Sequence, residues 1–427
     1  MMKKLIGVVM FALLYTCFGA GAALAQTRAY VTNAHDNTVS VIDTATNSVI
    51  ATVPVGSSPN SVAVTPNGRF ADVVNQFGNS VSVISAATNT VVATIPVATS
   101  PSAIAMNPNG AFAYVTSVSS SSISVIDTAT NTVVTAIPVT FPFMLATAPS
   151  GNLAYVTHGA FVNGVDVINT ATNSVVTNIP VPADVTNAVA VTPNGAFLYV
   201  TCLSFTTGSK LAVIDTATNT LVTIVPLPAT FAPGLAITPN GARVYVANNG
   251  GGVCCGGGGG VSSISVIDTA TNTEVARLAS SPSPSGVAVT PDGAFVYVTD
   301  LLNNFIFAIS TATNSVVAVV PVGNFPQSIA IGTFVPEPEV DPIESLIDHV
   351  EALIASGTLT QEQGAGLLDK IHQAVAKLDA GQTGAACNQL SGFINQVNAF
   401  IGNGTLTPAQ GQPLIDLANE IRASSGC

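Results

Sequence analysis

The chain has 427 residues, of which 48% are hydrophobic and only 7% are charged, and its formal net charge is -12. This composition excludes a disordered chain, and the excess of acidic residues argues against nucleic acid as a partner because it repels phosphate. The length exceeds what one ordinary hydrophobic core needs, so at least two domains are expected.

Residues 1–25 predict a secretory signal peptide. Lys3 and Lys4 precede an apolar run from Leu5 to Phe18, and Ala23-Leu24-Ala25 provides a cleavage site. Cys17 lacks the preceding small residue that a lipoprotein signal requires, so cleavage after Ala25 is preferred. The protein is therefore expected to be exported, either to the periplasm or to the cell surface and medium. No later stretch predicts a transmembrane segment.

Residues 28–335 contain an internal repeat. The phrase Thr-Ala-Thr-Asn, or a close variant, ends at Asn47, Asn89, Asn131, Asn173, Asn219, Asn272 and Asn314. A Tyr-Val-Thr-like segment recurs with it at Tyr30, Tyr114, Tyr155, Tyr199, Tyr245 and Tyr297, and so does a Pro-Asn-Gly-like turn. Each period holds four short runs rich in Val, Ile, Thr, Phe and Tyr, a composition typical of β-strands. Four strands per period of about 42 residues predict the blade of a β-propeller.

The repeat also carries a resemblance to a known family. Tyr30-Val31-Thr32-Asn33 spells the motif of the bacterial and archaeal YVTN repeat proteins, which the chain resembles over roughly residues 28 to 335. The resemblance implies a seven-bladed β-propeller of four-stranded antiparallel blades, and no single biochemical activity. The last segment, Ser328 to Ile331, matches Ser61 to Val64, so it is expected to complete the first blade in a three-plus-one closure.

Counting the strands of a blade outward from the axis, the turns between the first and second strands and between the third and fourth strands repeat. The remaining loops differ between repeats and lie together on the opposite face, here called the variable face, where function is expected. Its candidate binding residues are Phe77, Phe141, Phe143, His158, Phe161, Asp184, Phe205, Phe231 and Phe325. The phenylalanines form either a contact surface or an apolar plug of the channel mouth, and the plug is favoured.

The histidines and cysteines of the chain are the candidates for metal and disulfide sites. His35 and His158 lie three blades apart, so no shared metal site and no cofactor are predicted. Cys202 and the neighbouring-blade pair Cys254 and Cys255 are disulfide candidates, as are the tail cysteines Cys387 and Cys427. A bridge from Cys202 to the next blade, a vicinal Cys254-Cys255 bridge and adventitious metal binding remain alternatives.

The C-terminal part predicts a second domain. Residues 336–341 form a Pro-rich acidic linker, and residues 342–427 show helical periodicity. Capping boxes occur at Asp341 to Glu344, at Thr360 with Gln363 and at Thr407 with Gln410. Gly404-Thr405-Leu406-Thr407 copies Gly357-Thr358-Leu359-Thr360. Two helical hairpins are therefore expected to form a small bundle.

The tail resembles the FIMAH-type helical module of secreted bacterial proteins, on the stretches from Lys377 to Asp379, Cys387 to Leu390 and Phe393 to Val397. The resemblance implies an accessory module for interactions rather than a catalyst. Cys387 and Cys427 would tie its third helix to the chain end.

The leading hypothesis is a secreted, non-enzymatic binding or scaffold protein whose variable face contacts a protein or carbohydrate ligand. The sequence sets no oligomeric state. The alternative is a lactonase-like or other hydrolase with His158 and Asp184 at the channel mouth. A third role, as an accessory to a redox protein, has no haem or copper ligand set to support it.

Overall fold

The computed structural model describes residues 25–159, 162, 164–204, 208–250, 261–279, 282–335 and 342–427. The described strands all belong to one compact unit and the described helices to another, and each unit is treated by itself. Within these residues, no helix combines the length and the apolar character needed to cross a membrane.

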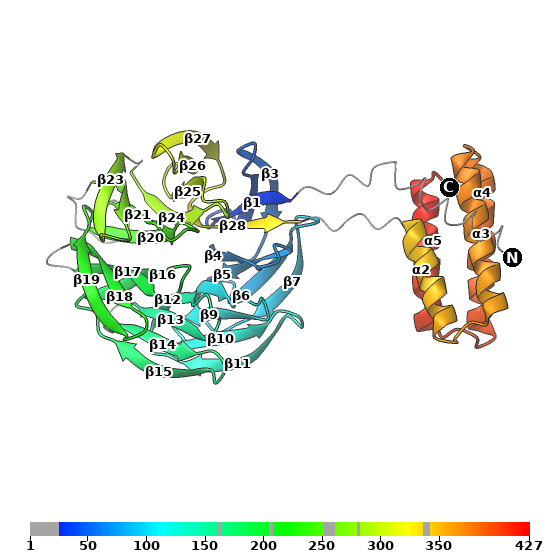
Figure 1. The fold of residues 1–427 in the computed structure, drawn as a ribbon, viewed down its shortest axis with the longest axis horizontal. Coiled ribbons are helices and arrows are strands. Elements are labelled where there is room, and N and C mark those ends of the chain that lie inside the picture. The colour runs from blue at the N-terminus through cyan, green and yellow to red at the C-terminus, as the bar shows by residue number, and fades with distance from the viewer. Residues whose placement is uncertain are drawn as a thin grey trace. The chain divides into compact units, whose positions relative to one another are not determined.

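Seven four-stranded antiparallel sheets form a β-propeller (Figure 1), which confirms the predicted fold class. The first strands of neighbouring blades contact each other in an unbroken ring around the axis. From the axis outward, blade 1 contains β28 (Pro326–Phe334), β1 (Gln26–Asn33), β2 (Thr38–Asp43) and β3 (Ser48–Pro54). Blade 2 contains β4 (Pro59–Val64), β5 (Phe70–Asn75), β6 (Ser80–Ser85) and β7 (Thr90–Pro96), and blade 3 contains β8 (Pro101–Met106), β9 (Phe112–Ser117), β10 (Ser122–Asp127) and β11 (Thr132–Pro138).

The remaining blades follow the same order. Blade 4 contains β12 (Pro142–Thr147), β13 (Leu153–His158), β14 (Val165–Asn169) and β15 (Ser174–Ile179), and blade 5 contains β16 (Val185–Val191), β17 (Phe197–Ser204), β18 (Gly208–Asp215) and β19 (Thr220–Pro226). Blade 6 contains β20 (Phe231–Ile237), β21 (Arg243–Asn249), β22 (Ser263–Asp268) and β23 (Thr273–Ala279), and blade 7 contains β24 (Pro284–Val289), β25 (Phe295–Asp300), β26 (Phe305–Ser310) and β27 (Ser315–Pro321).

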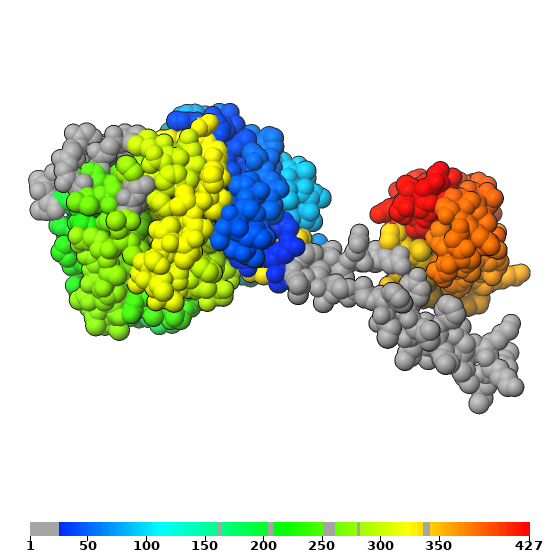
Figure 2. All heavy atoms as spheres, turned by 90° about the horizontal axis from the view of Figure 1, so that it is seen from above, coloured from blue at the N-terminus to red at the C-terminus, as the bar shows by residue number. Residues whose placement is uncertain are grey.

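Blade 1 closes the ring by joining the two ends of the repeat array. The C-terminal strand β28 pairs antiparallel with β1, with Ile331 opposite Ala29 and Ile329 opposite Val31. The blue and yellow segments therefore adjoin in Figure 2. Arg28 secures the seam, because its guanidinium donates to the Ala86 carbonyl in blade 2 and lies 4.8 Å from the ring centroid of Phe334. The predicted three-plus-one closure is confirmed.

Two of the repeated motifs hold neighbouring blades together. The Tyr199 hydroxyl donates to the Asn272 side chain at 2.7 Å, and the hydroxyls of Tyr245 and Tyr297 donate to Asn314 and Asn47 in the same way. Each tyrosine thus reaches the outer turn of the next blade. The seven repeated asparagines have φ between 50° and 54°, a left-handed conformation that Asn tolerates better than most residues. Both motifs therefore have a structural role.

Blade 2 departs from this arrangement because Asp72 occupies the tyrosine position. Asp72 lies opposite Val83 in the ladder, on the face that packs against blade 3, and its side chain is only 3% exposed. Burial raises the pKa of its carboxyl group to about 7. Asp72 is not among the predicted site residues, although it stands out when the seven repeats are aligned.

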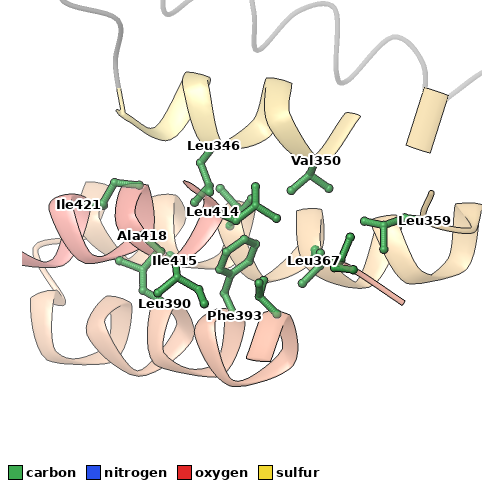
Figure 3. Close-up of a cluster of buried hydrophobic side chains, with 14 residues drawn as sticks. Leu346, Val350, Leu359, Leu367, Leu390, Phe393, Leu414, Ile415, Ala418 and Ile421 are labelled. Atoms are coloured by element: carbon green, nitrogen blue, oxygen red, sulfur yellow. The ribbon is translucent and has the colours of Figure 1, made fainter. Parts of the chain in front are cut away.

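The helical unit is a four-helix bundle with its own core (Figure 3). Its helices are α2 (Pro342–Ala355), α3 (Gln361–Asp379), α4 (Thr383–Gly402) and α5 (Pro408–Ser424). The capping boxes at Thr360 and Thr407 are present, whereas Asp341 lies outside the described residues. Leu359 and Leu406, which precede these caps, are each 1% exposed. The repeated Gly-Thr-Leu-Thr segment thus anchors both hairpin turns in one core.

Cys387 in α4 and Cys427 at the chain end form a disulfide with Cα atoms 6.0 Å apart and a sequence separation of 40 residues. Closing a loop of this length restricts the unfolded chain, so we expect Cys387→Ser with Cys427→Ser to lower the free energy of unfolding of the bundle by about 3 kcal/mol. Urea unfolding followed by helical circular dichroism measures this. The six tyrosines of the propeller give the internal control, since their near-ultraviolet signal is expected to stay unchanged. An unchanged helical transition would contradict the prediction.

Candidate ligand-binding channel

The seven first strands surround an axial cavity of about 710 Å³. Its walls come from the beginnings of these strands, and its rim comes from variable-face loops that include Gln76, Ser119, Gly159 and Phe325. None of the described lining residues belongs to the repeated turns of the opposite face. The cavity therefore lies at the variable face.

One residue per blade gives the channel its chemistry. Equivalent positions of the seven first strands are occupied by Asn60, Ser102, Phe143, Asn187, Pro233, Ser285 and Gln327. All seven residues line the cavity, and we call them the inner ring. Three residues further along each strand, all seven blades have alanine: Ala63, Ala105, Ala146, Ala190, Ala236, Ala288 and Ala330. The repeat thus keeps the alanine position constant and varies the position three residues before it.

Beside Gly234 and Gly286 the first strands of blades 6, 7 and 1 approach too closely for larger side chains. A Cβ atom added at Gly234 would lie 2.1 Å from the Ser285 carbonyl oxygen, and one added at Gly286 would lie 3.0 Å from that of Gln327. Glycine at these two positions permits the close approach of neighbouring backbones. The first strands of blades 6, 7 and 1 are therefore closely packed around the channel.

Several inner-ring side chains form hydrogen bonds to the backbone of a neighbouring blade. The Ser102 hydroxyl donates to the Phe143 carbonyl at 2.7 Å, and the Asn187 side-chain amide donates to the Ala232 carbonyl at 3.2 Å. The amide oxygens of Asn60 and Asn187, however, accept no hydrogen bond from the described residues. These two residues are only 8% and 2% exposed. Both oxygens are buried behind the channel surface rather than exposed in it.

The channel is uncharged along its described lining, which contains no Asp, Glu, Lys, Arg or His. Its lining combines amides, hydroxyls and apolar side chains, and Phe143 and Phe231 contribute aromatic rings. Such a surface has no counter-charge for an ionic group. It fits a ligand that is neutral, partly apolar and able to form hydrogen bonds.

The predicted phenylalanines divide into two groups. Phe143, Phe231 and Phe325 line the cavity without filling it. Phe143 and Phe231 lie within β12 and β20 rather than in loops, which corrects their predicted placement. Phe77 and Phe141 are 74% and 43% exposed at the variable face. Phe161 and Phe205 lie outside the described residues.

The loops preceding two of the first strands hold phenylalanine in an uncommon conformation. Phe141 and Phe325 have φ of 46° and 59°, in the left-handed region that bulky residues rarely adopt. The ring of Phe325 stacks on His35 with centroids 4.4 Å apart, which places His35 in an aromatic contact at the rim. The contact fixes one side of the channel mouth.

His158 is not a loop residue as predicted, but the last residue of β13, and it is 1% exposed. Its Nδ1 lies 2.8 Å from the Thr140 carbonyl oxygen, and its Nε2 lies 3.5 Å from Asp166 Oδ2. Burial lowers the pKa of the imidazole, but the Asp166 carboxylate and the Thr140 carbonyl outweigh it, so the pKa lies above its usual value. Burial raises the pKa of Asp166, but the nearby His158 imidazole and the hydrogen bond from the Asn178 amide outweigh it, so the pKa lies below its usual value.

The same two positions form polar pairs in other blades. Asn33 donates to Ser40 at 2.9 Å, Asn75 donates to Ser82 at 2.9 Å, and Asn248 donates to Ser265 at 2.8 Å. The pair of His158 and Asp166 therefore replaces an Asn-Ser pair of the repeat and holds β13 to β14. The predicted catalytic partner Asp184 is exposed, and its N–H donates to the Leu203 carbonyl at 2.9 Å. Neither His158 nor Asp184 is among the described lining residues of the channel.

Cys202 also differs from its prediction. It lies within β17 rather than in a loop, it is a free thiol, and it is 3% exposed in the core between blades 4 and 5. Burial raises the pKa of the thiol to about 12, so it is not a reactive thiolate. Cys254 and Cys255 lie outside the described residues. In the parts of the chain that the structure describes, no group of three or more His, Cys, Asp or Glu side chains could hold a metal ion.

Comparison with known proteins supports the two folds. The FIMAH domain family matches residues 343–423, in agreement with the resemblance of the tail. Curated proteins give no match.

The chain is similar in structure to Kuenenia stuttgartiensis hydrazine synthase, with a TM-score of 0.58 and 23% identity over 66% of this chain and 96% of that chain. It is also similar to a functionally unknown protein from Desulfotomaculum acetoxidans DSM 771, with a TM-score of 0.60 and 16% identity over 71% and 98%. The dihydro-heme d1 dehydrogenase NirN, in complex with DHE, gives a TM-score of 0.53 and 14% identity over 74% and 76%. At these identities the likeness concerns the fold alone.

Proposed function

We propose that this chain is an exported, non-enzymatic binding protein of the YVTN-repeat type, which uses the variable face of its propeller to contact a protein or carbohydrate. One observation carries the proposal: the cavity, the varied inner ring and the exposed aromatic side chains occur together at the face where the repeats differ. The opposite face consists of repeated turns whose side chains serve the fold.

The role of the helical domain follows from the same reasoning. A separate bundle with its own core and disulfide is suited to act as an accessory interaction module beside the propeller. The FIMAH match supports this assignment. Export is consistent with the predicted signal peptide and with the Cys387-Cys427 disulfide, since disulfides persist in oxidising compartments.

Phe77 tests the proposal, because its side chain is 74% exposed at the variable face. We expect Phe77→Ala to weaken binding of the purified protein to an array of glycans, peptidoglycan and matrix proteins by roughly 10-fold, as loss of an exposed aromatic contact does. Its free energy of unfolding is expected to change by less than about 0.5 kcal/mol.

Val134→Ala is the matched control, since Val134 is 52% exposed on the outer strand β11, away from the variable face. It is expected to leave binding unchanged. If no member of the array binds, or if Phe77→Ala binds as well as the unaltered protein does, the proposed function is wrong.

A further inference from the structure

We infer that Gln26 is a modification site, at which the mature chain closes its N-terminal glutamine to a pyroglutamate ring with the help of the Arg28 guanidinium. The inference rests on the proposed export of the chain, because cleavage after Ala25 leaves Gln26 as the first residue. It concerns the seam of blade 1 rather than the variable face, so it does not depend on what the propeller binds.

The fold holds Gln26 in a defined place. This residue begins β1, the strand by which the N-terminal end of the repeat array pairs with its C-terminal end. Its partner in the ladder is Phe334, at the end of β28, and its side chain is exposed. The ends of most chains are poorly ordered unless a strand or helix ties them down. Here the pairing with β28 does so, and the side chain stays accessible.

The Gln26 side-chain carbonyl oxygen accepts a hydrogen bond from Arg28 Nη2 at 2.6 Å. Hydrogen bonds from a charged donor are short and strong, and they polarise the carbonyl group that accepts them. The carbon of this carbonyl is the atom that an N-terminal amine attacks, and its oxygen gains negative charge during the attack. Arg28 therefore donates to the oxygen at which the charge develops, as a donor of an oxyanion hole does.

The Arg28 guanidinium is held in this position by its other contacts. Its Nη1 donates to the Ala86 carbonyl and, at 3.4 Å, to the Asn89 side chain, both in blade 2. Its central carbon lies 4.8 Å from the ring centroid of Phe334. Arg28 is also buried. Because these contacts fix the donor before the reaction, stabilising charge on the Gln26 oxygen requires little reorganisation.

The step needs no cofactor and no second substrate. The uncharged α-amino nitrogen of Gln26 attacks Cδ of the same residue and forms the C–N bond of a lactam. The carbonyl electron pair moves to Oε1 and returns as the bond from Cδ to the side-chain nitrogen breaks. That nitrogen takes the proton released by the amine and leaves as ammonia. An α-amino group is partly uncharged near neutral pH, so the nucleophile is available.

Ring closure also suits the electrostatics of the seam. Cleavage after Ala25 creates a positively charged α-ammonium group two residues from Arg28, and like charges at short distance repel each other. Formation of the lactam removes this charge. It also leaves no free α-amine for an aminopeptidase. The strand that closes the propeller thereby begins with an uncharged and blocked residue.

The rate of ring closure in the chain of residues 26–427 tests the inference. The chain is released from a fusion protein with Gln26 as its first residue, and intact-mass spectrometry follows the loss of ammonia. We expect closure to be at least roughly 10-fold faster than in a peptide of residues 26–31, which has the same sequence without the fold. Arg28→Met is expected to slow closure to the rate of the peptide. Arg422→Met, the same substitution in α5 of the helical unit, is the matched control and is expected to leave the rate unchanged.

A second measurement does not depend on the folding of Arg28→Met. In urea that unfolds the propeller, as tyrosine near-ultraviolet circular dichroism shows, the unaltered chain is expected to close at the rate of the peptide. Equal rates in the folded chain, the unfolded chain and the peptide would overturn the inference. So would a folded Arg28→Met variant that closes as fast as the unaltered chain.

The premise of cleavage is tested separately, with the full-length chain expressed in a bacterium and its N-terminus determined by mass spectrometry. We expect the mature chain to begin at residue 26 and to have lost ammonia. A chain that begins elsewhere overturns the inference through cleavage, and one that begins with an unmodified Gln26 overturns it through ring closure. Neither result changes the array experiment with Phe77→Ala, so a failure here and a failure of the proposed binding are distinguishable.

Discussion

Replacing Asp72 by asparagine is expected to raise the free energy of unfolding of the propeller by up to roughly 4 kcal/mol at pH 8 and to leave it nearly unchanged at pH 4. Asp72 is buried against the interface with blade 3, and no described residue provides an ion pair or hydrogen bond for it. No favourable interaction therefore offsets the free-energy cost of ionising the Asp72 carboxyl group. Asparagine removes the charge at nearly constant volume.

The direction of the pH dependence follows from the pKa values. Burial raises the pKa of Asp72 from 3.8 to about 7, so between these values the native state binds more protons than the unfolded state. The wild-type protein consequently loses stability as the pH rises from about 4 through 7. In Asp72→Asn this contribution disappears, and the two curves are expected to diverge as the pH increases.

Urea unfolding followed by tyrosine near-ultraviolet circular dichroism measures this effect. All tyrosines of the described residues belong to the propeller, and the chain has no tryptophan, so the helical unit does not contribute. Asp292→Asn is the control with the opposite sign, because hydrogen bonds from Thr290 and Ala294 lower the pKa of Asp292. A gain for Asp72→Asn that does not depend on pH would contradict the explanation.

A second variant tests the geometry behind the same explanation. Asp72→Tyr restores the residue of the other six blades, and its hydroxyl is expected to reach Asn131, as that of Tyr199 reaches Asn272. The added aromatic surface is expected to stabilise the interface further, by about 2 kcal/mol. If Asp72→Tyr is less stable than Asp72→Asn, the site has already collapsed around the smaller side chain.

The fold was predictable because its determinants recur along the chain. Seven copies of the Thr-Ala-Thr-Asn turn and six tyrosines recur in the blades, and three of these tyrosines bond to the turn of the next blade, as Tyr297 does to Asn47. The helices that begin after Thr360 and Thr407 were also predictable, since the capping boxes at these residues are local sequence signals. Local pattern and global packing agree in these elements.

The channel mouth was expected at the variable face, but its lining was not predicted, because the loops were expected to form the site whereas the inner ring lies within the first strands. His158 and Cys202 were assigned to loops for a related reason: the second strands extend beyond Tyr-Val-Thr, and the next position is a buried polar site in most blades. Alignment of the seven inner strands would have separated the constant alanines from the varied inner ring. The partner of His158 was missed because Asp166 stands where other repeats have serine.

Asp166→Ala is expected to lower the free energy of unfolding of the propeller by about 3 kcal/mol, since it leaves His158 buried without its carboxylate. The double substitution His158→Asn with Asp166→Ser recreates the pair that Asn33 and Ser40 form in blade 1, and it is expected to cost less than about 1 kcal/mol. A catalytic pair has no such structural equivalent. The stability comparison therefore separates a structural pair from a catalytic one.

The pH dependence gives a second and sharper test. In the native protein the pKa of His158 is raised, so its contribution is fully present below about pH 6.5 and is lost as the pH rises through the raised value. In Asp166→Ala only burial and the Thr140 carbonyl act on the ring, and burial, the larger effect, lowers its pKa. Stability is then expected to rise with pH below about pH 6.5 and to stay level above it, where the contribution of the native pair falls. Both proteins carry Asp72→Asn for this measurement, because Asp72 titrates in that range. Equal slopes of the free energy of unfolding against pH in the two proteins would show that Asp166 does not hold the proton on His158. The assignment of this pair as a charged structural replacement for the Asn-Ser pair would then be wrong.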